Sequence, residues 1–227
     1  MMVATTAPAE SMFGKALKRR EDPKLITGTG SFLDDVQLVN LAHVAILRSP
    51  HAHGRITAID TTAAAAVPGV VGVFTGADFM DINPLPCAWQ AAGVQNNVNT
   101  PRVLAVDEVH FVGDPIAAVV AETSEIAADA LDLIEVQYDV LPAVVDAVAA
   151  VQPGAPQIHE NAPENVVLDW TCGQSADDTS AAIANAPIRL SQHIVNQRLI
   201  PTSMETRGSI GRYDSGTGEY TLWATSQ

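Results

Sequence analysis

The 227-residue sequence contains only two cysteines, Cys87 and Cys172, which lie far apart along the chain. Two thiols cannot form a disulfide framework, and an iron–sulfur cluster held by thiolates needs four of them. We therefore expect both cysteines to be small buried hydrophobic residues rather than redox or metal ligands. Any iron–sulfur electron carrier in the system would have to lie on another chain.

Long apolar runs are also missing. No stretch approaches the roughly 18–20 apolar residues that a bilayer-spanning helix needs, so we expect no membrane span. The first residues, "MMVATTAPAESMFGKALKRRED", lack the apolar core of a secretory signal. Polar residues follow Arg19 and Arg20, where a twin-arginine signal would be apolar. We interpret this pair as a solvated turn and expect a cytoplasmic protein.

Positive charge is scarce in the middle of the chain. The formal net charge is −14, and positions 103 to 188 hold 15 carboxylates and no lysine or arginine. Such a surface repels the phosphate backbone, so we expect no nucleic-acid partner. The hydrophobic fraction of 47% and charged fraction of 17% are instead typical of a globular protein with a substantial core.

The first part of the chain has a strand and helix pattern. Alternating apolar residues predict strands at 42–49, 55–60 and 70–75. The alanine-rich stretch 61–67 predicts a helix, with Thr61 as a plausible N-cap. Residues 78–103 carry proline, glycine and asparagine without a period, so we expect a long irregular loop.

A second strand and helix pattern follows. The apolar run 116–121 predicts a strand covered on both faces, and 134–140 returns to strand alternation. Between them, from Ser124 onward, the apolar residues follow one face of a helix, and Glu125 in its first turn suits the helix dipole. Strand–helix–strand units are ordinarily parallel and right-handed, so we expect that arrangement.

The pattern of predicted strands and helices changes at the Pro/Gly cluster 153–156. We expect a helix at 175–186 capped by Ser175, and strands at 165–174, 188–201, 208–214 and 219–227. This second layer is not completed, so we expect the chain to be the front part of something larger. The predicted domains are a flexible tail at 1–13, a first α/β domain at 14–150 and the incomplete start of a second at 151–227.

Few single residues suggest chemistry by themselves. His51 and His53 are spaced as i, i+2, but no third ligand lies nearby, so a metal site is weakly supported and a turn is preferred. The other four histidines are isolated in the sequence. Glu205 and Arg207 lie in "QRLIPTSMETRGSI". Glu205 suits either a general base or an ion pair with Arg207 or Arg198, and residue types favour the ion pair.

Four segments together resemble a known enzyme family. They are "GKALKRREDPKLITGTGSFLDD", "LRSPHAHGRITAIDTTAAAAVPGVVGVFTGADF", "VHFVGDPIAAVVAET" and "NQRLIPTSMETRGSIGRYDSGTGEYTLWATSQ". In this order they are similar to the large subunit of the xanthine dehydrogenase, aldehyde oxidase and carbon monoxide dehydrogenase family of molybdenum hydroxylases. The resemblance implies an α/β-hammerhead domain followed by the first part of a molybdopterin-binding domain.

The resemblance also assigns roles to residues. A glutamine at the end of such a strand lies near the molybdenum in the family and hydrogen-bonds an oxo ligand, and the matching residue is Gln227. A primary amide donates a hydrogen bond without adding charge, which suits this role. Glu205 matches a family glutamate that resembles a supporting or fold residue rather than the catalytic base, and Arg207 is placed with it.

The implied activity is oxidation of an aldehyde, an N-heteroaromatic or a similar small substrate, with water as the oxygen source. Carbon monoxide is the alternative substrate. The resemblance implies a molybdenum–molybdopterin cofactor, with the cytosine dinucleotide form expected. It also implies an iron–sulfur small subunit carrying [2Fe-2S] and an FAD-binding medium subunit, in a dimer of heteromers.

The family's Gly-Gly-Phe-Gly-Gly loop, its substrate-positioning segment and its late catalytic glutamate are not found in this sequence. Two explanations stay open: the chain is a fragment, or the large subunit is divided between two polypeptides. On either, the chain alone is not expected to be active. A hypothesis of another class is a non-catalytic hammerhead module that binds partner proteins.

Overall fold

Residues Asn40–His193 contain two small antiparallel sheets and form one of two compact units of the chain. The computed structural model describes residues 13–87, 94, 96–97 and 100–226. The second unit joins the described residues before Asn40 to those from Ile194 onward. This mixture of helices and strands agrees with the expected α/β (α+β) class. No helix in the described ranges is long and apolar enough to cross a membrane.

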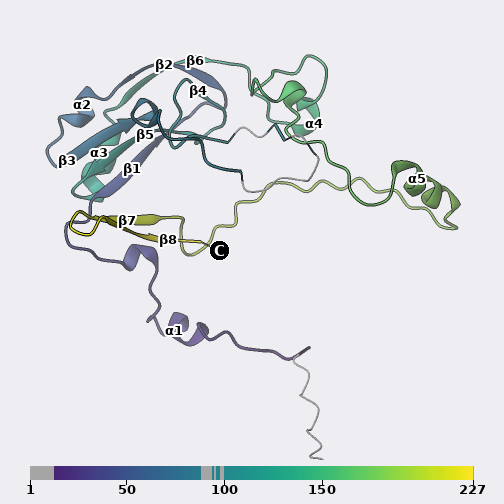
Figure 1. Cartoon of the computed structure of the whole chain (residues 1–227), viewed down its shortest axis with the longest axis horizontal. Coiled ribbons are helices and arrows are strands. Elements are labelled where there is room, and N and C mark those ends of the chain that lie inside the picture. The colour runs from purple at the N-terminus through teal and green to yellow at the C-terminus, as the bar shows by residue number, and fades with distance from the viewer. Residues whose placement is uncertain (1–12, 88–93, 95, 98–99, 227) are drawn as a thin grey trace, which may run out of the picture. The chain divides into compact units, whose positions relative to one another are not determined.

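The first sheet has the order β1-β5-β3 (Figure 1). Its strands are β1 (His43–Arg48), β5 (Pro115–Ala121) and β3 (Val70–Thr75), and both pairings are antiparallel. The central strand β5 is the most buried of the three, which explains its continuous apolar sequence. The strands expected at 42–49, 70–75 and 116–121 are therefore confirmed.

One face of this sheet is covered by α2 (Thr62–Ala65) and α3 (Ser124–Leu131). The buried core between them is small and rich in alanine, which lets the helices lie close to the strands: Ala64, Ala117, Val119, Ala121, Ala127, Ala130 and Ile134. The Thr123 hydroxyl accepts from the Ile126 N–H at 3.3 Å and caps α3. Burying one valine such as Val119 contributes about 1.5–3 kcal/mol.

The start of α2 differs in one detail from the expectation. Thr61 is at the N-cap position, but its side chain makes no capping hydrogen bond. The Asp60 carboxylate instead accepts from the Thr62 N–H at 2.9 Å. Hydrogen bonds from the Thr62 side chain and backbone hold the pKa of Asp60 below its ordinary value.

The second sheet has the order β4-β2-β6. β2 (Gly54–Asp60) lies between the short β4 (Glu108–Val109) and β6 (Glu135–Val140), with antiparallel pairing on both sides. Because β2 and β4 meet at Gly54 and Arg55, the residues that flank them lie close together. This junction positions the histidine cluster described below for the candidate site.

The expected parallel strand–helix–strand unit was wrong. β5 and β6 flank α3 in sequence, but they belong to different sheets, and each pairs antiparallel with its neighbours. An apolar run specifies burial on both faces, and the centre of an antiparallel sheet meets that requirement as well as a parallel sheet does. The pairing direction was therefore not encoded in the pattern that we used.

Between residue 140 and the end of this unit at His193, short elements are separated by irregular segments. They are α4 (Ala147–Ala150), the 3₁₀ turn η3 (Pro163–Asn165) and α5 (Ala176–Asn185). Ser175 caps α5 by accepting from the Asp178 N–H at 3.1 Å, as expected. The strands expected at 165–174 and 188–201 were wrong, since Asn165 ends η3 and the described residues 166–174 and 188–201 form neither helix nor strand. Alternation favours a strand only where a neighbouring edge supplies a ladder of hydrogen bonds, and neither segment is paired with a strand in the part of the chain that the structure describes.

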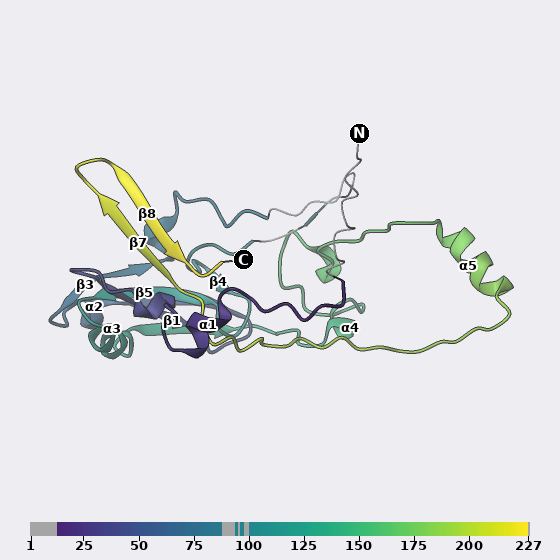
Figure 2. The same ribbon diagram turned by 90° about the horizontal axis from the view of Figure 1, so that it is seen from below.

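The second unit is built around a hairpin. β7 (Ser209–Asp214) and β8 (Glu219–Ala224) run side by side as an antiparallel ribbon (Figure 2). The turn closes through the Gly218 N–H, which donates to the Asp214 carbonyl at 2.7 Å, and Gly218 has φ 76°. Left-handed φ favours glycine here. The strand expected at 208–214 is confirmed, and the strand expected at 219–227 is confirmed over Glu219–Ala224.

Two short helical elements precede the first sheet in the sequence. They are α1 (Asp22–Ile26) and the 3₁₀ turn η1 (Leu33–Asp35), both in the second unit. The 3₁₀ turn η2 (Gly76–Phe79) follows β3. After it, the described residues of the expected loop 78–103 form no helix or strand. Most of the expected tail 1–13 lies outside the described residues.

Candidate functional site

The end of β8 carries the residue that we matched to the cofactor. β8 ends at Ala224, and Thr225 is held against Gly208 at the start of β7. The Thr225 N–H donates to the Gly208 carbonyl at 3.2 Å, and the Gly208 N–H donates to the Thr225 hydroxyl at 3.1 Å. Gln227 itself lies outside the described residues, so its contact with the cofactor stays a prediction.

Glu205 binds a backbone group rather than a charged side chain. Its Oε1 accepts from the Leu33 N–H at 3.0 Å, far away in sequence. The Ser203 hydroxyl donates to the Glu205 carbonyl at 2.7 Å and fixes the local backbone. Within the described part of the chain, no ion pair joins Glu205 to Arg207 or Arg198, so that expectation was wrong. Arg207 is exposed, and its expected supporting role stays a prediction.

The partner of Glu205 is explained by the geometry of η1. The first N–H groups of a helical turn have no acceptor inside the turn. The Asp35 carboxylate accepts from the Phe32 N–H at 2.8 Å, which satisfies one of them. The next N–H, that of Leu33, is satisfied by Glu205. The alternation of residues around Glu205 contains no signal for such a distant backbone partner.

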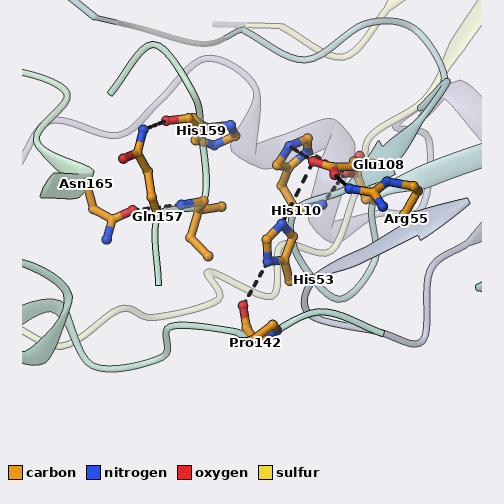
Figure 3. A network of polar contacts seen from close by, with 10 residues as sticks. His53, Arg55, Glu108, His110, Pro142, Gln157, His159 and Asn165 are labelled. Carbon is orange, nitrogen blue, oxygen red and sulfur yellow. Dashed lines mark hydrogen bonds and ion pairs between the residues drawn. The ribbon is translucent and has the colours of Figure 1, made fainter. Parts of the chain in front are cut away.

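Two of the histidines that are isolated in the sequence, His110 and His159, come together with His53 in the first unit. Figure 3 shows His53 and His159 on either flank of a central His110, with Glu108 beside His110. The rings of His53 and His110 have centroids 5.9 Å apart, and those of His110 and His159 are 4.4 Å apart, with both pairs inclined by 28°. The interpretation of His110 and His159 as isolated residues was therefore wrong.

His53 is the most buried member of this cluster, with 6% of its surface exposed. Its Nδ1 lies 2.8 Å from the Pro142 carbonyl oxygen, which can only accept, so Nδ1 carries the proton. Its Nε2 is buried without a hydrogen-bond partner in the described structure. This nitrogen lies 4.0 Å from Glu108 Oε2, and a proton on Nε2 would therefore face a carboxylate.

His110 lies between two carboxylates. Its Nε2 is 3.8 Å from Glu108 Oε2, its Nδ1 is 3.9 Å from Asp114 Oδ2, and its backbone N–H donates to Asp114 at 3.0 Å. Burial lowers the pKa of His110 below 6.5, although both carboxylates oppose this shift. Burial also raises the pKa of Asp114. The cluster therefore favours a neutral His110.

His159 reaches the cluster because the segment around it is folded back on itself. The Asn165 side-chain amide donates to the carbonyls of Ala150 and Pro156, each at 2.9 Å, and its Oδ1 accepts from the Ile158 N–H at 2.9 Å. Asn165 has φ 59°, a left-handed conformation that asparagine tolerates. Burial, followed by the nearby histidines, lowers the pKa of His159.

The histidine cluster is better described as a set of stacked titratable rings than as a metal centre. Stacked rings present their faces to one another, so their lone pairs do not converge on one point. Among the described residues, no group of three or more His, Cys, Asp or Glu side chains could hold a metal ion. A cleft of about 730 Å³ opens beside the cluster, and residues of both charges line it, including Arg55, Arg102, Glu108, Asp114 and Glu160.

Cys87 and Cys172 are both exposed, so the expectation that they are buried was wrong. Both lie in described segments without helix or strand. Neither is close to the histidine cluster in sequence, and neither belongs to a metal-binding group within the described residues.

Two family descriptions match the chain. The a/b hammerhead domain of aldehyde oxidase and xanthine dehydrogenase matches residues 27–142, about half of the chain. The molybdopterin cofactor-binding domain matches residues 158–227. Together they define the class of protein, a hammerhead domain followed by the start of a molybdopterin-binding domain. The chain belongs to the aldehyde oxidase and xanthine dehydrogenase family of molybdenum enzymes.

Relatives support this assignment. The chain is 36% identical to the carbon monoxide dehydrogenase large chain of Hydrogenophaga pseudoflava, over 92% of this chain and 26% of the relative. It is 34% identical to the nicotine 6-hydroxylase large subunit of Paenarthrobacter nicotinovorans, over 96% and 26%. The crystal structure of quinoline 2-oxidoreductase from Pseudomonas putida 86 is similar with a TM-score of 0.78 and 33% identity, over 94% of this chain and 27% of that one. The chain thus spans about a quarter of the length of these relatives.

Proposed function

We propose that this chain forms part of a molybdenum hydroxylase and contributes the hammerhead domain and the beginning of the molybdopterin-binding region. The observation that carries the proposal is the match of residues 158–227 to the molybdopterin cofactor-binding domain, directly after the hammerhead match. We further propose domain limits of 1–13 for the tail, 14–150 for the hammerhead domain with its entry segment, and 151–227 for the second region.

The cofactor would be held in part by Gln227. The chemistry of the strand end fits this group, because the Thr225 hydroxyl is already engaged by Gly208, and a neutral glutamine amide follows two residues later. Such an amide can donate a hydrogen bond without adding charge. When bound, the molybdenum cofactor supplies two-electron oxidation of the substrate, with water as the oxygen source. The contribution of this chain is to position the donor.

The substrate is proposed to be an aldehyde, an N-heteroaromatic compound or a similar small molecule, with carbon monoxide as the second candidate. The names of the relatives support both, since they include a carbon monoxide dehydrogenase and a nicotine hydroxylase of nearly equal identity. A catalytic base would lie outside this chain. A non-catalytic hammerhead module is the alternative of another class, and a molybdenum-free complex would favour it.

We propose that the cofactor is the cytosine dinucleotide form of molybdopterin, and that a cytoplasmic dimer of heteromers contains the enzyme. Its other members would be the remainder of the molybdopterin-binding subunit, an iron–sulfur small subunit with [2Fe-2S] and an FAD-binding medium subunit. Two exposed cysteines in this chain support placing the clusters on a partner.

Purification of the chain with its natural partners tests these proposals. Elemental analysis should find molybdenum, acid release should yield a cytosine nucleotide, and a dye-linked assay should detect turnover of one member of a panel of aldehydes, N-heteroaromatics and carbon monoxide. A complex that contains no molybdenum would contradict the proposed function. Turnover of carbon monoxide alone would select the second candidate substrate.

A further inference from the structure

We propose that Glu205 is a positioning residue that acts through the backbone of Leu33 to fix the strand end leading to Gln227. The effect on turnover rests on the proposed function, whereas the contact itself does not. All residues in this argument belong to the unit formed by the described residues before Asn40 and those from Ile194 onward.

The contact between Glu205 and Leu33 is braced on both sides. On one side, Asp35 accepts from the Phe32 N–H at 2.8 Å and caps the 3₁₀ turn η1, which holds the backbone next to the Leu33 N–H. On the other side, the Ser203 hydroxyl donates to the Glu205 carbonyl at 2.7 Å. A carboxylate that accepts a backbone N–H makes a strong, charge-assisted hydrogen bond.

The Leu33 side chain packs against Gly208. A methyl group added at Gly208 would lie 2.5 Å from Leu33 Cδ2, which is too close for two carbon atoms. Leu33 therefore packs directly on the backbone at the start of β7, and the absence of a side chain at position 208 makes this approach feasible. Gly208 does not have a left-handed φ, so space, rather than conformation, explains the glycine.

Gly208 in turn holds the end of β8. Its N–H and its carbonyl both bind Thr225, at 3.1 Å and 3.2 Å. The contacts therefore run from Glu205 to Leu33, then to Gly208 and to Thr225, two residues before Gln227. Because Glu205 is engaged by a backbone N–H, it serves as an anchor in this arrangement rather than as a general base.

The test compares Glu205→Ala, Glu205→Gln and Gly208→Ala in the enzyme purified with its natural partners. The control is Glu219→Ala, since Glu219 is an exposed carboxylate on β8 whose side chain makes no hydrogen bond or ion pair within the described residues. Amide exchange at Leu33 and Thr225 reports the contact without any need for the cofactor. Molybdenum content, kcat and KM report the consequence for the site.

Glu205→Ala should speed exchange at the Leu33 amide by about 10-fold or more, since a hydrogen bond to a charged group is lost. It should lower kcat by about 10- to 100-fold, with KM and molybdenum content retained. Glu205→Gln keeps an oxygen acceptor but not the charge, so it should restore exchange and kcat in part, to values between those of Glu205→Ala and wild type. Gly208→Ala displaces Leu33 and should speed exchange at both amides.

Three results would overturn the proposal. They are unchanged exchange at Leu33 in Glu205→Ala, faster exchange with unchanged kcat, and a Glu205→Gln enzyme as impaired as Glu205→Ala. If Glu205→Ala does not fold, the Gly208→Ala variant is used to test the proposal. Unchanged amide exchange at Leu33 and Thr225 in Gly208→Ala would refute the series of contacts. Absence of molybdenum from the wild-type complex would instead refute the proposed function and leave the exchange result valid.

Discussion

The imidazole of His159 stacks on that of His110, with centroids 4.4 Å apart and planes inclined by 28°. Four other titratable groups lie nearby: Glu108, Asp114 and His53 lie beside His110, and Glu160 follows His159 in the cleft wall. Both stacked histidines have a pKa below 6.5, with burial as the main cause. The contact therefore prefers neutral rings.

This preference predicts a pH-dependent contact. A group whose pKa is lower in the folded state contributes stability that is complete above its unfolded pKa and is lost as pH falls toward its folded pKa. We therefore expect amide exchange in residues 156–165 to accelerate as pH falls from 7.5 to 5.5, after correction for intrinsic exchange. The pKa of Asp114 is raised in the folded state. Its contribution to stability is therefore present at low pH and is lost as the pH rises through that folded pKa, opposite in sign to the contribution of the histidines.

His159→Phe keeps an aromatic ring without a titratable proton, so the extra pH dependence should become weaker in this variant. His193→Gln is the matched control, because His193 is exposed and belongs to none of the ring contacts in the described structure. An identical pH profile in wild type and His159→Phe would contradict the role of the stack.

Replacement of His53 should be costly, although its sequence neighbourhood looks like an ordinary turn. His53→Ala removes the 2.8 Å hydrogen bond to the Pro142 carbonyl and leaves a cavity, so we expect unfolding free energy to fall by about 2–4 kcal/mol. His51→Ala should cost about 1 kcal/mol, since His51 loses only an edge contact with Tyr138. Urea denaturation of the two variants measures the difference, and equal effects would contradict the assigned burial of His53.

A glycine at position 76 is required by a close approach of the backbone. A methyl group at Gly76 would meet the backbone carbonyl of Ala105, which has no rotamer by which to move away. We expect Gly76→Ala to lower the unfolding free energy by about 1–3 kcal/mol. Gly211→Ala should be neutral within about 0.5 kcal/mol, because no atom lies within 4 Å of the added carbon and φ is not left-handed. Thermal unfolding of both variants checks this contrast.

Gln227→Ala should retain molybdenum and assembly but lose turnover. A hydrogen bond that tunes a reacting centre through its surroundings typically contributes about 10- to 100-fold to activity. Ser226→Ala, at an exposed neighbour, should keep wild-type kcat. A Gln227→Ala enzyme with full metal content and wild-type kcat would show that the residue is an ordinary strand end.

Sequence patterns predicted the helices and strands better than they predicted which strands pair with one another. The strands around Ile46, Ile56 and Val119 and the helix at Ala127 were predicted because each has its own period of apolar residues. Their division between two antiparallel sheets depends on which strand edges pair with one another, and the local spacing of apolar residues does not specify this. The stretch around Leu190 alternates in apolar and polar residues, but no described strand pairs with it, and Leu190 is 95% exposed.

The candidate site was predictable only where a resemblance supplied it. Gln227 and Glu205 came from matching a family pattern, and the hydrogen bond from Leu33 to Glu205 could not have been found from residue types. His53, His110 and His159 come from three distant segments, each with a single histidine at the contact point. Only the pairing of β2 with β4 and the fold of the segment closed by Asn165 bring them together.

The ring stack has a consequence for how the two family regions can be exchanged. His53 and His110 lie in the region matched to the hammerhead domain, whereas His159 lies just inside the region matched to the molybdopterin-binding domain. A chimaera joined between residues 142 and 158 would take His159 from one parent and the two rings beside it from the other. The junction between the two regions therefore depends on three residues at once, and a successful exchange would have to transfer all of them.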